Sequence, residues 1–89
     1  MKIKSGFVVQ KVGGKYLAVA VGEMANEFNA LVRMNETGMF MWNKLSEADI
    51  TEDELLALLL EEYEVDVERA RADIGAFVEK LRSVGLFNE

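Results

Sequence analysis

The stretch LVRMNETGMFMWNKL (residues 31–45) contains the transition that divides the chain into a strand-rich part and a helix-rich part. The first four letters predict a short strand, and the remainder places apolar residues at the three- and four-residue steps of a helix. Asn35 stands at the junction, where its side-chain oxygen can accept a backbone N–H group left unpaired in the first helical turn. This stretch therefore predicts a strand that runs directly into a capped helix.

The part of the chain before this transition predicts strands. The three predicted strands are residues 6–12 (GFVVQKV), 15–21 (KYLAVAV) and 30–34 (ALVRM). Gly13 and Gly14 separate the first two, and two glycines can adopt the positive φ angles of a tight hairpin turn. Residues 22–29 are polar and irregular, so we expect a loop there.

The part after the transition predicts three helices. The first begins at Asn35 and ends before a turn at residues 46–50. Thr51 and Glu54 form a capping-box pattern that opens the second helix, which we expect to extend through Tyr63. Asp66 is the expected N-cap of the third helix, over residues 67–83, and Gly85 is its expected C-cap glycine. Leu86 and Phe87 are then expected to fold back onto the helices.

These elements predict an α+β fold that is winged helix-turn-helix-like, with a three-stranded antiparallel sheet followed by a three-helix bundle. We expect one domain over residues 1–89, with the strands in residues 1–34 and the helices in residues 35–89. A chain of this length can bury a core of its own.

Composition excludes several kinds of site. The chain has no cysteine and no histidine, so a disulfide framework, a thiolate zinc site and a histidine general base are all absent. We expect no cofactor. The longest apolar runs are far shorter than the roughly 20 residues that span a bilayer, and no signal-peptide pattern opens the sequence, so we expect a cytoplasmic protein with no membrane partner.

Charge is distributed unevenly between the two parts. Residues 1–34 carry five basic and two acidic side chains, whereas residues 35–89 carry five basic and fourteen acidic ones. An acidic helical part is poorly suited to bind nucleic acid, because phosphate binding needs clustered Lys and Arg. The strand region could face a partner with acidic groups, although a solvated acidic helical surface explains the same pattern.

The ordered set of motifs resembles the PqqD family over residues 7–87. The most specific parts are MNETG, at residues 34–38, and the run that begins with Asp73-Ile74 and ends with Gly85-Leu86. The resemblance implies a recognition domain for ribosomally synthesised, modified peptides. Such domains bind the leader segment of a precursor as an added strand beside the third strand and third helix. They then deliver it to a modifying enzyme, often a radical S-adenosylmethionine protein.

The resemblance and the alternation of side chains along a strand together suggest a peptide-binding site. Val32 and Met34 are expected to face the helices and Leu31 the opposite side, with the backbone of residues 31–33 pairing with the peptide. On the third helix, Gly75 would allow either a close approach by the peptide or tight internal packing. The full set of expected peptide-binding residues is Leu31, Val32, Arg33, Met34, Arg71, Ile74, Gly75, Val78 and Arg82.

The charged members of this set have two interpretations. Arg71 and Arg82 could pair with carboxylates of the leader, or they could be solvated arginines. An unpaired third strand also permits self-pairing, so a monomer or a homodimer, including a strand-swapped one, is compatible with the sequence. The precursor could be that of pyrroloquinoline quinone or another modified peptide, because residues 22–29 are longer and more polar than the family pattern.

Three other functions fit the sequence less well. A winged-helix DNA-binding module, or another protein-interaction module, is the main alternative, but the second helix (TEDELLALLLEEYE) contains no Lys or Arg. An acyl carrier protein would need an Asp-Ser-Leu attachment site, which Ser5, Ser46 and Ser83 do not provide. A stand-alone enzyme would need paired catalytic groups, and none is evident, so we expect no catalytic activity.

Overall fold

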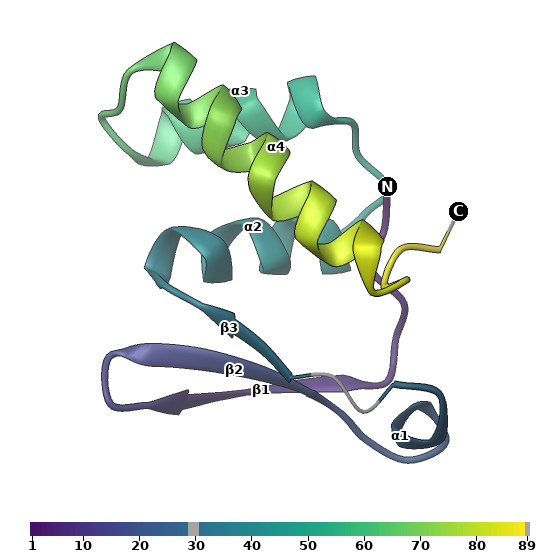
Figure 1. The fold of residues 1–89 in the computed structure, drawn as a ribbon. Helices are drawn as coiled ribbons and strands as arrows, with labels where there is room; N and C mark the ends of the chain where they lie inside the picture. Colours follow the sequence, from purple (N-terminus) through teal and green to yellow (C-terminus); the bar gives the residue numbers. More distant parts are fainter. Residues whose placement is uncertain (29–30, 89) are drawn as a thin grey trace.

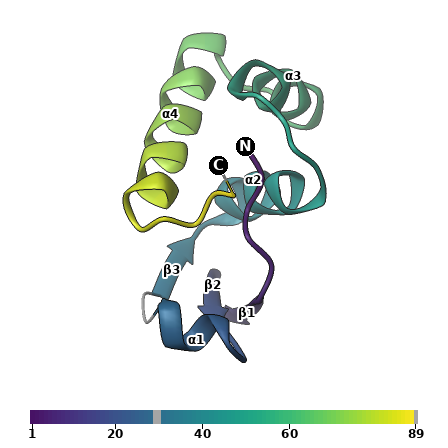
Figure 2. The same cartoon turned by 90° about the vertical axis from the view of Figure 1, so that its right-hand side faces the viewer.

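The fold is a small antiparallel sheet covered on one side by helices (Figures 1 and 2). The computed structural model describes residues 1–28 and 31–88. Its elements are β1 (Phe7–Val12), β2 (Lys15–Ala20), α1 (Met24–Glu27), β3 (Leu31–Met34), α2 (Glu36–Glu47), α3 (Glu52–Glu62) and α4 (Val67–Ser83). The predicted α+β class is confirmed, with a three-stranded antiparallel sheet followed by the three long helices.

The sheet has the order β1-β2-β3, so β3 is an edge strand. Gly13 has a φ of 57°, in agreement with the hairpin predicted from the two glycines. Ala18 pairs with Val32, and both side chains are buried beneath the helices. Leu31 and Arg33 alternate with these buried positions and are exposed on the other face of the sheet. The alternation expected for β3 is therefore confirmed.

The predicted loop over residues 22–29 was partly wrong, because residues Met24–Glu27 form the single-turn helix α1. Gly22, with a φ of 63°, turns the chain, and its carbonyl accepts a hydrogen bond from the Ala25 N–H at 3.1 Å. Phe28 follows the helix and packs its ring 5.8 Å from that of Phe7. This aromatic contact ties a polar segment to the sheet, which composition alone does not indicate. Residues 29 and 30, at the end of the predicted loop and the start of the third predicted strand, lie outside the described residues.

The three predicted helix starts are confirmed by their caps. The Asn35 side chain accepts a hydrogen bond from the Gly38 N–H at 2.8 Å. Thr51 and Glu54 form the complete capping box, with both reciprocal bonds present. Asp66 accepts from the Arg69 N–H at 3.3 Å. These short-range bonds fix where each helix begins, which explains why the sequence located the starts well.

The end of α4 closes the helix in the manner that a C-cap glycine allows. Gly85 has a φ of 74°; its N–H donates to the Arg82 carbonyl and the Leu86 N–H to the Leu81 carbonyl. This is the Schellman arrangement, which turns the chain back on itself. Leu86 and Phe87 are consequently buried, as predicted. Phe87 also pairs with Ile3 of the amino-terminal segment, a contact that the sequence did not predict.

The core lies between the sheet and the three long helices. Its members are apolar side chains from every major layer, including Val32, Met34, Met41, Trp42, Leu45, Leu55, Leu59, Ile74, Val78 and Leu81. Met41 and Trp42 are only 3% and 4% exposed, so they belong to the core. None of the described helices is long and apolar enough to cross a bilayer.

Candidate functional site

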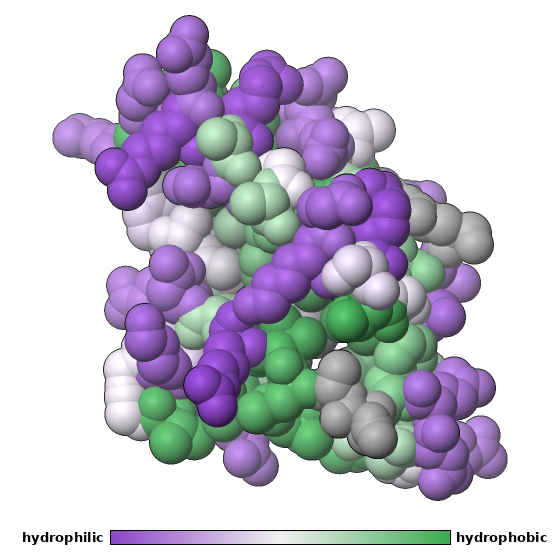
Figure 3. Space-filling model, viewed as in Figure 1, coloured by the Kyte–Doolittle hydropathy of each residue, from purple (hydrophilic) through white to green (hydrophobic). Residues whose placement is uncertain are grey.

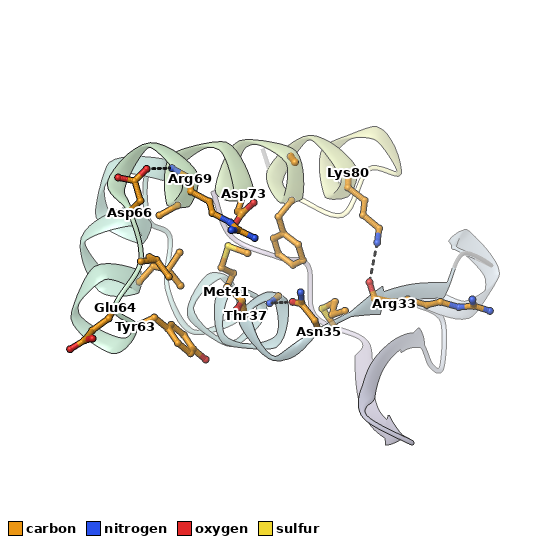
Figure 4. Close-up of a pocket in the computed structure, with 17 residues that line it drawn as sticks. Arg33, Asn35, Thr37, Met41, Tyr63, Glu64, Asp66, Arg69, Asp73 and Lys80 are labelled. Carbon is orange, nitrogen blue, oxygen red and sulfur yellow. Dashed lines mark hydrogen bonds between the residues drawn. The ribbon is translucent and has the colours of Figure 1, made fainter.

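A groove of about 720 Å³ begins at Arg33 and Met34, the last two residues of the edge strand β3, and continues between α4 and the helices α2 and α3. We call it the β3–α4 groove, and it extends from Arg33 and Lys80 at one end to Tyr63–Asp66 at the other (Figure 4). On the face viewed in Figure 3, hydrophilic residues gather mainly over α3 and α4, whereas hydrophobic ones show mainly in the lower half, over the sheet.

The interior of the β3–α4 groove is apolar. Met41 of α2, Leu59 of α3 and Phe77 of α4 contribute to its lining, and each is at most 9% exposed. Tyr63 borders the far end, where its ring makes an edge-to-face contact with Phe40 at a centroid distance of 5.6 Å. Such a lining can bury an apolar side chain of a ligand, because removal of apolar surface from water is favourable.

The rim of the groove is charged, and its charges are ordered along its length (Figure 4). Arg33 and Lys80 stand at the β3 end, and Glu64 and Asp66 stand at the α3–α4 end. Between them lie Arg69 and Asp73 of α4, and all six side chains belong to exposed residues. An apolar interior with a charged rim is suited to a peptide, whose side chains can be apolar on one side and charged on the other.

The edge of β3 supplies backbone groups to this groove. Lys80 Nζ donates a hydrogen bond to the Arg33 carbonyl oxygen at 2.9 Å, so this carbonyl points away from β2 and toward α4. In an antiparallel pair the residues alternate between bonding to the neighbour and pointing outward. The outward-pointing residues of β3 are therefore Leu31 and Arg33, and the backbone groups of Val32 and Met34 face β2.

The sequence-predicted residues of β3 divide between different positions. Arg33 and Met34 line the groove. Leu31 is 48% exposed on the outer face of the sheet, and its backbone lies on the open edge. Val32 is buried, with its backbone directed toward β2, so it has no group available for an added strand. Only alternate residues of the predicted run can therefore pair with a peptide.

None of the five predicted residues of α4 lines the groove. Ile74 and Val78 are 2% and 1% exposed and lie in the core, away from the groove. Arg71 forms an ion pair with Asp53 of α3 at 3.1 Å, and Arg82 lies 5.6 Å from the centroid of the Phe87 ring. Gly75 has no neighbour within 4 Å of where a Cβ would stand, so neither close packing nor a groove wall explains it.

The groove face of α4 is the stripe that the sequence analysis missed. Its members are Arg69, Asp73, Ala76 and Lys80, together with Ala70 and Phe77, which also belong to the core. Each of the first four directly precedes a core residue, namely Ala70, Ile74, Phe77 and Leu81. The signal was present as a second stripe at three- and four-residue steps beside the apolar one. This second stripe contains charged and small residues, so a search for hydrophobic periodicity does not detect it.

Comparison with known proteins adds to this geometry. A family model described as coenzyme PQQ synthesis protein D (PqqD) matches residues 24–86. Among solved structures, the chain is similar to one described as "TbiB1 in Complex with the TbiA(beta) Leader Peptide", at 19% identity and a TM-score of 0.72. That match covers 99% of this chain and 95% of the other. A search of curated proteins gave no match. Since the family model spans more than half of the chain, the protein belongs to the PqqD family.

Proposed function

We propose that this protein binds the leader segment of a ribosomally synthesised precursor peptide and presents it to a modifying enzyme, without catalysis of its own. The leader adds as a fourth strand to β3 and lies in the β3–α4 groove. One observation carries the proposal: the open edge of β3 borders a groove with an apolar interior and a charged rim. The similar fold of TbiB1 was solved with a leader peptide, which supports the same class of ligand.

The backbone of β3 supports strand addition. Leu31 and Arg33 turn their N–H and C=O groups to the edge, which an extended peptide can pair with at the ordinary strand spacing of about 4.8 Å. Main-chain hydrogen bonds of this kind give affinity for any extended peptide, and side-chain pockets give specificity. The strand is short, so the pockets of the groove must contribute much of the selection.

The groove face of α4 supports a revised set of contact residues. Arg69, Asp73, Ala76 and Phe77 replace Arg71, Ile74, Gly75, Val78 and Arg82 as the α4 residues that meet the peptide. Phe77 and Met41 would receive an apolar leader side chain. Arg69 and Asp73 lie on the exposed rim, where their charges can orient the peptide along the groove.

The partner and the location of the protein follow from this role. A leader-binding domain without an active site needs a separate enzyme, and the family resemblance favours a radical S-adenosylmethionine enzyme. The precursor is made on the ribosome, so the encounter takes place in the cytoplasm. The precursor of pyrroloquinoline quinone and that of another modified peptide remain the two candidates.

The test is titration of the protein with synthetic leader peptides from the precursors encoded beside its gene, each carrying a single backbone N-methyl group. The parent leader is expected to bind with a dissociation constant of about 1 μM or tighter, near −8 kcal/mol. N-methylation should weaken binding at alternate positions only, because every second amide of an added strand points at β3. Binding that is insensitive to N-methylation at every position would contradict strand addition.

A further inference from the structure

The side chain of Lys80 occupies a backbone group that strand addition requires. Its Nζ stands 2.9 Å from the Arg33 carbonyl oxygen (Figure 4), which is one of the two acceptors that β3 turns to the edge. A strand paired with β3 would place a backbone nitrogen at about the same distance, since N–H···O bonds are about 2.9 Å long. The amine and the peptide nitrogen therefore compete for one position.

In the free protein, Lys80 substitutes for the missing strand. A lysine beside an open edge is a common protection against unwanted pairing, because its charge is costly to bury under another strand. When a leader adds to β3, the amine must leave the carbonyl. Its charge then lies beside the new strand, at the end of the groove where Arg33 is also basic.

No carboxylate of the described residues forms an ion pair with Lys80. Met1 pairs with Asp49 and Arg71 with Asp53, and Lys80 takes part in neither ion pair. On the groove face of α4 the nearest acidic residue is Asp73, which precedes Lys80 by about two helical turns, roughly 10 Å along the axis. A carboxylate supplied by the ligand next to Arg33 would place a counter-charge directly at the displaced amine.

We propose that Lys80 is a specificity-determining residue that selects leaders with an Asp or Glu beside the residue that pairs with Arg33. This inference rests on the proposed function and adds the chemistry that one leader position must have. A leader with that carboxylate gives the displaced ammonium a charged acceptor in place of the carbonyl. With a neutral residue at that position, the displaced Lys80 ammonium is solvated only by water, and the leader binds more weakly.

The expected preference is moderate. The ammonium is exposed, so solvent and salt weaken its attraction to the carboxylate. Exchange of the peptide Glu for Gln at the selected position should weaken binding about three- to tenfold, in the range between exposed ion pairs and charge-assisted hydrogen bonds.

The experiment uses a displayed library of random peptides, selected against the full chain and three variants. Lys80→Met keeps the apolar stem of the side chain but removes the charge. Lys80→Gln also removes the charge but keeps a polar end group. Lys15→Met is the matched control, because Lys15 is an exposed lysine at the start of β2 that does not line the groove. Thermal melts establish that each variant is folded before selection.

The wild type and Lys15→Met should enrich peptides with an acidic residue at a fixed spacing from an apolar anchor. Both Lys80 variants should enrich the same anchor without the acidic position, and should bind the Glu and Gln forms of a selected peptide equally. Enriched peptides without an acidic position, or an acidic preference that persists in both Lys80 variants, would overturn the role of Lys80 and leave the proposed function intact. A wild type that enriches no peptide would overturn the proposed function itself.

Discussion

Two adjacent faces of α4 have different tasks. Ile74, Val78 and Leu81 lie on one face and are at most 2% exposed, so they hold the helix against the core. Asp73 and Lys80 lie one position earlier, on the face that borders the β3–α4 groove. The comparison shows that the strongest hydrophobic stripe of a helix marks what it packs against inside the protein. A ligand-binding face can be the weaker, mixed stripe beside it.

The largest expected effect comes from the core face. Leu81 is fully buried, so Leu81→Ala should lower the free energy of unfolding by about 2–5 kcal/mol. Urea titration measures the loss. Val84→Ala, at a 37% exposed position just beyond α4, is the control and should cost much less. Equal losses from the two substitutions would mean that the core face is misassigned.

The groove face should control binding instead of stability. Ala76→Trp would fill the groove with an indole and weaken leader binding at least about tenfold, or 1.4 kcal/mol. Ala72→Trp is the matched control, since Ala72 is also exposed on α4 but does not line the groove. Isothermal titration calorimetry with the same leader compares them. If the two variants bind the leader equally well, the groove is not the binding site.

A smaller effect is expected at Gly75, which belongs to neither face. An added Cβ would meet no atom within 4 Å, and glycine in a helix interior costs about 0.5–1 kcal/mol relative to alanine. Gly75→Ala should therefore stabilise the protein by about that amount, as measured by thermal unfolding, and leave leader affinity unchanged. A loss of affinity would revive the idea that the peptide approaches the helix closely at this glycine.

The smallest effect is expected at Arg71, on the side of α4 that meets α3. Its ion pair with Asp53 joins two side chains that are 61% and 83% exposed. Arg71→Ala should change the free energy of unfolding by less than about 1 kcal/mol, because exposed ion pairs contribute little. Leader affinity should also stay within error in a fluorescence anisotropy titration. A clear drop in affinity would place the peptide on this side of the helix.

The features of the fold that could be predicted are those set by interactions between residues close in the sequence. The hairpin glycines and the caps at Asn35, Thr51 and Asp66 act over a few residues, so the sequence alone located the turns and the helix starts. The packing of Phe28, which follows α1, against Phe7 was missed because it joins residues far apart in the sequence. The pairing of Ile3 with Phe87 was missed for the same reason, since it joins the two ends of the chain.

The candidate site was predictable to a smaller extent. The choice of β3 as the docking edge agrees with its place at the edge of the sheet. The α4 residues were chosen from the apolar stripe and its flanks, and the structure places Ile74 and Val78, the two from the stripe itself, in the core. Which neighbouring stripe faces the groove depends on the rotation of α4 about its axis, and packing against α3 and the sheet sets that rotation.

Amide hydrogen exchange at β3, with and without a bound leader, tests the central claim most directly. The claim predicts that the Leu31 and Arg33 amides become protected when the leader binds, while those of Val32 and Met34, already directed at β2, change little. Protection that appears at β1, the other edge of the sheet, or at neither edge would contradict the account.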